Sequence, residues 1–433
     1  MRPSKPASSC NVAALLTLSI FSFSISGIAE PSEHVLYAFS SPPPGCSSPS
    51  APLIADAVGN LYGTTYDLGA YKDGCVFELS PSDNGWQYTL LSSFSGPDGA
   101  YPASGLVFDK LGNLYGATGG GGTYGGGAAF ELSPLAGGGW GETVLYSFGN
   151  GDDGYDPRSK LIFDNAGNLY GTTEFGGAGR TGTVFKLSPS QAGWTETILY
   201  AFPDSVSGPN GSNPVGGVVM DREGKLYGNT NVGGALGDGA VYELSPSDGG
   251  YDEKVIYSFN VYDGLQPISG LTMDRNGNLY GTTSSGGDMS VCYYVGCGIV
   301  FELTKDTEGN WNEKILHEMT GSDGSYTVGP VVFDSAGNLY AAAQFGGNNG
   351  MGSVFELTPT RSGPWKETML HLFDYQFPNG KDGESPYAGV IFDRGRVFGT
   401  TSGGGGSYNS GTVFEITPLE NAPAAPDTSE EQP

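Results

Sequence analysis

Positive charge is scarce in this sequence. Its 433 residues include 19 Lys and Arg against 46 Asp and Glu, so the formal net charge is −27. An acidic surface repels the phosphates of nucleic acids and the anionic headgroups of membranes. We therefore expect neither nucleic acid nor a membrane surface among the partners of this protein.

Recognisable catalytic signatures are absent as well. The sequence has three histidines, His34, His317 and His371, and no G-x-S-x-G nucleophile motif. His317 and His371 replace the Tyr of a recurrent "LYSF" segment, so we interpret them as substitutions in outer strands and not as metal ligands. Asp and Glu residues at repeated positions are explained by the repeat itself. Only acids that occur once, such as Asp152 and Asp288, are then candidates for the carboxylate pair of a glycosidase. We assign no catalytic residue.

Long apolar runs are confined to the N-terminus. Residues 11–26, "NVAALLTLSIFSFSIS", follow Arg2 and Lys5 and precede the small residues of "GIA". This order predicts a signal peptide over residues 1–29, cleaved after Ala29. An uncleaved anchor helix is the alternative, but a membrane span needs about 20 apolar residues. We expect a secreted, extracellular protein without a membrane span, and the cell envelope stays open as its location.

Cysteine is also rare. Four cysteines remain after the predicted cleavage: Cys46, Cys75, Cys292 and Cys297. An even number in an exported chain predicts disulfides, and four cysteines allow three pairings. We favour Cys46–Cys75 with Cys292–Cys297, because the latter two flank the short segment "YYVG". A zinc site is the alternative, although the spacing fits no familiar zinc pattern and no histidine is near.

Glycine, in contrast, is abundant and periodic. Near-copies of "GNLYGTTEFGG" recur seven times, 53 to 60 residues apart. The third unit contains four segments rich in β-branched and aromatic residues: "KLIFD" at 160–164, "NLYGTT" at 168–173, "TVFKLSP" at 183–189 and "TILYAF" at 197–202. Turn residues bound each segment, as expected for strands, and no sustained helical period is present outside the signal.

Four short strands in about 55 residues are typical of one propeller blade. The mature chain begins with a lone fourth segment, "HVLYAF" at 34–39, and ends with three segments that lack a fourth. We therefore predict an all-β fold, a seven-bladed β-propeller over residues 30–418 whose last blade is completed by residues 34–39. Such closure removes exposed sheet edges, which an open solenoid would keep. Residues 419–433 are predicted to form a disordered acidic, proline-rich tail, and we expect a monomer.

The repeated string has a structural interpretation. In each "D-x-x-G-N" turn the carboxylate can accept backbone N–H bonds, whereas the acidic run of an EF-hand calcium loop is missing. The glycine inside "LYGTT", such as Gly171, indicates a close approach, and we expect an aromatic ring from the next blade over it. The "GG" pairs predict tight loop corners. The "W-x-E" glutamates, Glu142, Glu196, Glu313 and Glu367, fit exposed hairpins.

Candidate ligand-binding residues lie in the loops between blades. These loops repeat an Asp-Gly turn and share one face with the loops after each second strand. An Asp-Gly pair favours a tight turn by itself, so these residues can be explained without a ligand. Alternatively, the carboxylates form a rim that binds a cation or sugar hydroxyls, with tyrosines as stacking surfaces. The rim consists of Asp98, Asp153, Asp263, Asp323, Asp382, Tyr101, Tyr155 and Tyr326. Calcium, bound at this rim, is the only cofactor that we consider.

The unit "D-x-x-G-N-L-Y-G-T-T-x-x-G-G…G-x-V-F-E-L-S-P" resembles the GloVer tandem-repeat proteins over residues 34–418. The resemblance implies a secreted bacterial repeat protein, often with a C-terminal anchoring signal, and supplies no catalytic residues. The tail "LENAPAAPDTSEEQP" has no apolar stretch. We therefore expect release rather than anchoring.

Three functions are compatible with these features. The first is a non-catalytic extracellular module that binds a carbohydrate or another protein. The second, by analogy with propeller lactonases and lyases, is an extracellular enzyme acting on a polysaccharide or a lactone. The third is a purely structural envelope protein.

Overall fold

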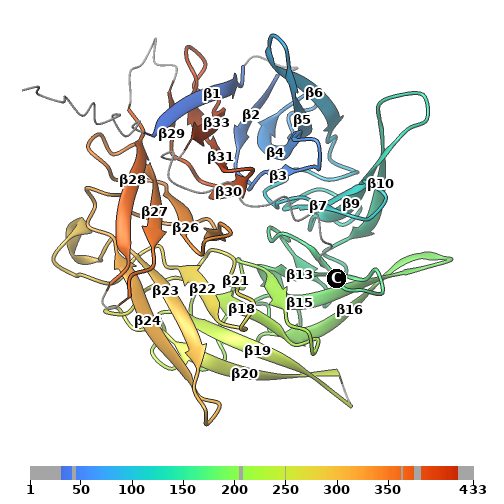
Figure 1. Ribbon diagram of the computed structural model, residues 1–433. Helices are drawn as coiled ribbons and strands as arrows, with labels where there is room; N and C mark the ends of the chain where they lie inside the picture. Colours follow the sequence, from blue (N-terminus) through green and yellow to red (C-terminus); the bar gives the residue numbers. More distant parts are fainter. Residues whose placement is uncertain are drawn as a thin grey trace, which may run out of the picture.

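The computed structural model describes residues 31–40, 45–203, 208–248, 250–361, 364–374 and 382–417. The predicted signal peptide and tail lie outside these residues. Seven antiparallel sheets surround a central axis, with their short first strands nearest the axis (Figure 1). The protein is a seven-bladed β-propeller, as the sequence predicts. No helix among the described residues is long and apolar enough to cross a membrane.

The first four blades follow one another along the chain. Blade 1 contains β3 (Ile54–Ala55), β4 (Leu61–Leu68), β5 (Cys75–Ser82) and β6 (Gly85–Ser93), with β2 (Cys46–Pro49) beside β4. Blade 2 contains β7 (Val107–Phe108), β8 (Leu114–Thr118), β9 (Ala128–Pro134) and β10 (Trp140–Ser147). Blade 3 contains β12 (Ile162–Phe163), β13 (Leu169–Thr173), β15 (Thr183–Ser190) and β16 (Gly193–Ala201). Blade 4 contains β17 (Val218–Met220), β18 (Leu226–Thr230), β19 (Ala240–Ser247) and β20 (Gly250–Ser258).

Three further blades complete the ring. Blade 5 contains β21 (Thr272–Met273), β22 (Leu279–Thr282), β23 (Ile299–Lys305) and β24 (Trp311–Glu318). Blade 6 contains β25 (Val332–Phe333), β26 (Leu339–Ala343), β27 (Ser353–Thr358) and β28 (Lys366–Leu372). Blade 7 contains β30 (Val390–Asp393), β31 (Arg396–Thr401), β33 (Thr412–Thr417) and β1 (Ser32–Ala38). Short pairs join β11 (Gly154–Tyr155) to β14 (Phe175–Gly176) and β29 (Gly383–Glu384) to β32 (Gly403–Gly404), and a 3-10 turn, η1, covers Cys292–Tyr294.

The ring is closed by the N-terminal strand. β1 pairs antiparallel with β33, with Ser32 opposite Thr417 and Ala38 opposite Thr412. Two backbone bonds of 2.9 Å continue this seam: the N–H groups of Phe39 and Ser48 donate to the carbonyls of Gly411 and Ser410. The predicted completion of the last blade by residues 34–39 is therefore confirmed.

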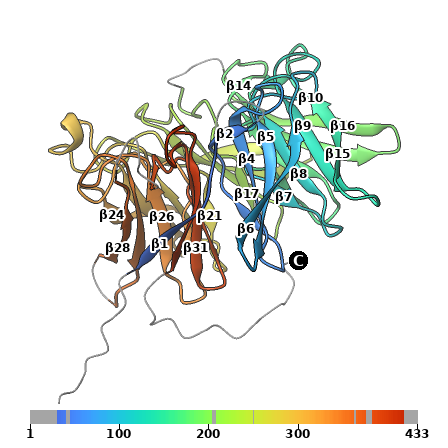
Figure 2. The same ribbon diagram turned by 90° about the horizontal axis from the view of Figure 1, so that it is seen from above.

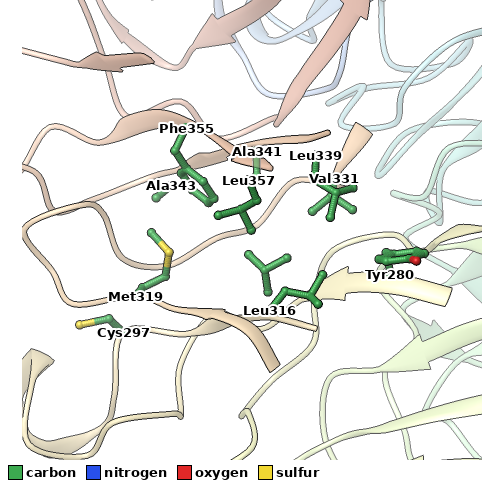
Figure 3. Packing of buried hydrophobic residues seen from close by; sticks show 11 residues of the cluster. Tyr280, Cys297, Leu316, Met319, Val331, Leu339, Ala341, Ala343, Phe355 and Leu357 are labelled. Atoms are coloured by element: carbon green, nitrogen blue, oxygen red, sulfur yellow. The ribbon is translucent and has the colours of Figure 1, made fainter. Parts of the chain in front are cut away.

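The hydrophobic core lies between blades. Figure 3 shows one such layer, in which Tyr280, Leu316 and Met319 of blade 5 face Leu339 and Leu357 of blade 6. Equivalent clusters occur at the other blade boundaries. A blade packs against a neighbour on each side, so its strands carry apolar residues on both faces.

Both disulfides form with the favoured pairing. Cys46 of β2 is bonded to Cys75 of β5, which fixes the entry strand to blade 1. Cys292 is bonded to Cys297, which closes the loop that contains η1. Figure 2 shows this loop, in yellow, on the same side of the ring as β2 and β14.

The repeated turns form as expected. Asp164 Oδ1 accepts hydrogen bonds of 2.9 Å from the N–H groups of Ala166 and Asn168, and Oδ2 accepts 2.7 Å and 3.0 Å bonds from Asn168 Nδ2 and the Tyr170 hydroxyl. Gly176 and Gly177 have φ values of 82° and 72°, which are the left-handed angles of tight corners.

The aromatic rings that pack over the mid-strand glycines come from a different blade than predicted. Gly171 is paired with Phe185 on the next strand of its own blade, and a Cβ added to Gly171 would lie 2.8 Å from Phe185 and from Leu161. The expectation of a ring from the next blade is wrong. Antiparallel register places both side chains on one face of one sheet, so the contact is within the blade. Ala341 in blade 6 is fitted against Phe355 by the same pairing.

A second repeated contact joins outer strands across blade boundaries. Each interblade cluster contains an outer-strand residue, the Asp or Asn of the following loop and a Glu from the next outer strand. In one of them the Tyr146 hydroxyl lies 3.1 Å from Asp153 and 3.4 Å from Glu196. The six described clusters are Ser92/Asp98/Glu142, Tyr146/Asp153/Glu196, Tyr200/Asn210/Glu253, Tyr257/Asp263/Glu313, His317/Asp323/Glu367 and His371/Asp382/Glu33.

The "W-x-E" glutamates are therefore not exposed, and that expectation is wrong. The Oε1 atoms of Glu142, Glu196, Glu313 and Glu367 are all buried without a hydrogen-bond partner. The reason is that one face of each outer strand packs against the outer strand of the preceding blade. Burial, followed by the charge of Asp263, raises the pKa of Glu313 to about 8, and burial together with Asp153 raises the pKa of Glu196 to about 8.

We predict that Gly171→Ala lowers the free energy of unfolding by about 1–3 kcal/mol, because the new methyl group overpacks a filled site. Thermal unfolding followed by circular dichroism measures the effect. Gly137→Ala is the matched control, since a Cβ at Gly137 meets no atom within 4 Å. Equal melting temperatures for the Gly171→Ala variant and the native chain would contradict the close packing.

We predict that protonated Glu313 stabilises the fold at low pH. Its folded pKa of about 8 exceeds the ordinary 4.5, so this stabilisation is complete below about pH 4.5 and is lost as the pH rises through 8. Glu313→Gln stays neutral and should be more stable than the native chain at pH 9 by roughly 1–3 kcal/mol. The measurement is melting temperature between pH 5 and 9, with Glu318→Gln at an exposed site of β24 as control. Parallel curves for the native chain and both variants would disprove the buried proton.

Candidate binding site at the funnel mouth

The predicted aspartates lie in the loops between blades, but their carboxylates bond inward. Asp98 accepts bonds of 2.7 Å and 2.9 Å from the backbone N–H and the hydroxyl of Ser95. Asp263 accepts 2.9 Å from the Tyr257 hydroxyl, and Asp382 accepts 3.0 Å from the N–H of Asp374. Asp153 and Asp323 are only 7% and 9% exposed. These carboxylates anchor the loops, and their role as ligand-binding residues stays a prediction.

Six of these loops reach a left-handed residue three positions after their Asp or Asn, and the seventh reaches one three positions after Gly45. Tyr101 and Tyr326 have φ values of 60° and 61° there, and their N–H groups donate to the carbonyls of Asp73 and Cys297 on the preceding blade, at 2.8 Å and 3.1 Å. These bonds fix the loops across the blade boundaries. The corresponding residues in the other blades, also left-handed, are Ser48, Asp156, Asn213, Gln266 and Ser385.

Two basic side chains follow in blade 3. Arg158 Nε donates a 2.7 Å bond to Asp156 Oδ1 and lies 3.6 Å from Glu174 Oε2. Lys160 is accessible to solvent, yet the protein mass around it lowers the pKa of its ammonium group. A Cβ added at Gly105, in the segment before blade 2, would lie 3.5 Å from the Lys160 side chain, and one added at Gly217, before blade 4, would lie 3.4 Å from the Lys160 carbonyl. Lys160 therefore lies where segments of three successive blades meet.

Tyrosines from distant blades interact electrostatically with Arg158 and with one another. Burial raises the pKa of Tyr387, the charges of Tyr326, Glu174 and Tyr66 raise it further, and Arg158 lowers it. The hydrogen bond to Asp156, and further the charge of Tyr66, raise the pKa of Arg158. The Tyr66 ring also stacks on Tyr101, with centroids 5.2 Å apart. We call Tyr66, Tyr101, Arg158, Glu174, Tyr326 and Tyr387 the funnel-mouth cluster.

The charges within this cluster are nearly balanced. The hydrogen bond to Asp156 raises the pKa of Arg158, so its guanidinium stays charged. Burial raises the pKa of Glu174, and the nearby Arg158 opposes that shift. Arg158 thus lies beside two carboxylates, Asp156 at 2.7 Å and Glu174 at 3.6 Å. The site therefore offers planar donors, carboxylate acceptors and phenol rings without a strong net charge.

The sequence located part of this cluster. Tyr101 and Tyr326 belong to it, whereas Tyr155 lies one position earlier in its loop and stacks on Phe175 at 5.5 Å. Tyr66, Arg158, Glu174 and Tyr387 were missed. Aligning the repeats on the proline after the left-handed residue would have shown Arg158 and Tyr387 where other blades carry Ser, Ala, Val or Ile. Asp152 and Asp288 are exposed and lie outside the cluster.

A hollow of about 430 Å³ lies beside the seam between blades 7 and 1. Its lining includes Ser48, Asp67 and Lys72 on one side and Tyr408 and Asn409 on the other. None of its lining residues belongs to the funnel-mouth cluster, so this polar hollow is a separate feature. The volume is within the range of small-ligand sites.

Solved propellers share this fold at low sequence identity. Virginiamycin B lyase from Staphylococcus aureus aligns with a TM-score of 0.52 and 11% identity, covering 90% of this chain and 99% of that one. A 6-phosphogluconolactonase homologue from Bacteroides uniformis, itself of unproven activity, aligns with a TM-score of 0.49 and 14% identity, covering 76% and 86%. No curated protein matches the sequence.

The family comparison covers nearly the whole chain. The model of the Gloeobacter/Verrucomicrobia repeat matches residues 19–142, 48–294 and 289–425. These overlapping matches include all seven copies of the repeated string, and they confirm the resemblance drawn from the motif. The chain belongs to the Gloeobacter/Verrucomicrobia repeat family.

Proposed function

We propose that this protein is a secreted, non-catalytic module that binds a neutral carbohydrate at the funnel-mouth cluster. The proposal is supported by a group of tyrosines that interacts with Arg158 and Glu174: Tyr66 stacks on Tyr101, and Tyr387 is affected by Tyr66, Tyr326, Arg158 and Glu174. Tyrosine provides a large, rigid contact surface at low conformational cost, and its hydroxyl can bond to a ligand. The Arg158–carboxylate network adds donors and acceptors that suit sugar hydroxyls.

Electrostatics favour a neutral ligand over an anionic one. Arg158 is balanced by Asp156 and Glu174, and the chain as a whole is strongly acidic. A polyanion would be repelled by the surface before it reached Arg158. A neutral oligosaccharide meets no such barrier.

An enzyme acting on a polysaccharide or a lactone is the second candidate. Burial raises the pKa of Glu174 above its ordinary value, and Glu174 lies beside Arg158, so it is the candidate general acid. The shared fold of virginiamycin B lyase supports this candidate by analogy only. Turnover of a bound sugar, lost in Glu174→Gln, would favour the enzyme over the module.

We predict that Arg158→Ala and Tyr387→Ala each weaken binding about 10–100-fold, equivalent to about 1.4–2.8 kcal/mol, because both remove central contacts. A neutral glycan array identifies a ligand for the tag-free protein, and titration calorimetry then measures Kd. Tyr155→Ala, which removes an exposed ring outside the cluster, is the matched control and should bind normally.

Parallel titrations in buffers that contain calcium or EDTA test whether ligand binding requires calcium. Binding lost in EDTA, or lost equally in Tyr155→Ala and Asp153→Ala, would move the site to the outer aspartate rim. No saturable binding of any neutral glycan in either buffer would refute the carbohydrate module.

A further inference from the structure

Two of the six interblade clusters carry histidine in place of tyrosine or serine. His317 Nε2 lies 3.0 Å from Asp323 Oδ2 and 4.0 Å from Glu367 Oε1. At the next boundary His371 Nε2 lies 3.2 Å from Asp382 Oδ2, with Glu33 as the third member. In each cluster the three ligand atoms lie within 4.8 Å of one another.

The third member of each cluster presents an oxygen that nothing in the described chain satisfies. Oε1 of Glu367 and Oε1 of Glu33 are buried and accept no hydrogen bond, as is the case for the equivalent atom in the four clusters without histidine. The two histidine clusters differ in that an imidazole nitrogen lies within reach of both carboxylates. A buried carboxylate oxygen without a partner is costly, and a cation is one way to satisfy it. The side chains of His317, Asp323 and Glu367 are 15%, 10% and 26% exposed, so an ion could enter and keep contact with water.

The three side chains also come from separate segments with fixed backbones. His317 lies on β24, Asp323 in the following loop and Glu367 on β28. His371 lies on β28 and Glu33 on β1. Strand pairing sets the positions of the His and Glu residues, and Asp323 is held by the 2.8 Å bond that it accepts from the N–H of Thr320. The same residue types thus recur in the same arrangement at two successive boundaries.

We propose that each of these two clusters binds one Zn²⁺ ion through a histidine Nε2, an aspartate oxygen and a glutamate oxygen. One nitrogen and two carboxylate ligands, with water in the fourth position, suit tetrahedral zinc. The equivalent clusters with Tyr146, Tyr200 or Tyr257 have a phenol in place of the imidazole and are not expected to bind the ion.

The positions of the two sites suggest a structural role. The first joins blade 5 to blade 6, and the second joins blade 6 to β1, the strand that closes the ring. An ion that binds only the assembled boundary stabilises the folded state, in proportion to the logarithm of its concentration over Kd.

The test is titration calorimetry of the tag-free, metal-free full chain with Zn²⁺ in excess Mg²⁺. We expect two Zn²⁺ per chain, one in His317→Tyr, one in His371→Tyr and none in the double variant. Loss of the imidazole should weaken each site by more than about 100-fold. These variants are expected to fold, because tyrosine is the native residue in three equivalent clusters.

A gain of function provides the reciprocal test. Tyr257→His, beside Asp263 and Glu313, should add a third Zn²⁺ of similar affinity. Visible absorption of bound Co²⁺ reports whether the coordination is tetrahedral, and Zn²⁺ should raise the melting temperature of the native chain but not of the double variant. Undiminished Zn²⁺ binding in the double variant, or no binding to the native chain at millimolar Zn²⁺, would overturn the proposal and leave a simple histidine–carboxylate hydrogen bond.

Discussion

The antiparallel pairing of β1 with β33 is the contact on which the rest of the structure depends. Six blades are continuous in sequence, but the seventh lacks its outer strand until Ser32–Ala38 pairs with Thr412–Thr417. Without this pairing, the apolar layer between blade 7 and blade 1, which includes Phe39, Leu61 and Val413, would be incomplete. Closure also brings loops that are distant in sequence toward one axis, so Tyr66 affects the pKa of Tyr387 across more than 300 residues of sequence.

Much of this architecture could be predicted because the same strand and turn residues recur in seven repeats. Strand composition, turn residues and spacing were visible in every unit, and the missing fourth strand at one end matched the surplus strand at the other. The disulfide pairing could also be predicted from the sequence, because the short segment between Cys292 and Cys297 limits the partners that each cysteine can reach. Local chemistry and counting were sufficient for the fold.

Contacts that depend on register and on blade twist could not be predicted in this way. Gly171 clearly needed a ring above it, but only the pairing of β13 with β15 shows that the ring is Phe185 of the same blade. Glu313 appeared to lie on an exposed hairpin, because the sequence does not show which face of an outer strand meets the preceding blade. The funnel-mouth cluster was missed for a similar reason: its members share neither a motif nor a neighbourhood in sequence.

The loops between blades connect the interblade clusters on the outer strands to the tyrosines of the funnel-mouth cluster. Asp323, held by His317, begins the loop that places Tyr326 at the funnel mouth, and Asp382, held by His371, begins the loop that carries Tyr387. Tyr326 is fixed at its other end by hydrogen bonds to Cys297 and Gln344. A loop of so few residues with both ends fixed has little freedom, and rigid placement reduces the entropy lost when a ligand binds. The hydrogen bonds of the outer clusters therefore anchor the loops that carry Tyr326 and Tyr387.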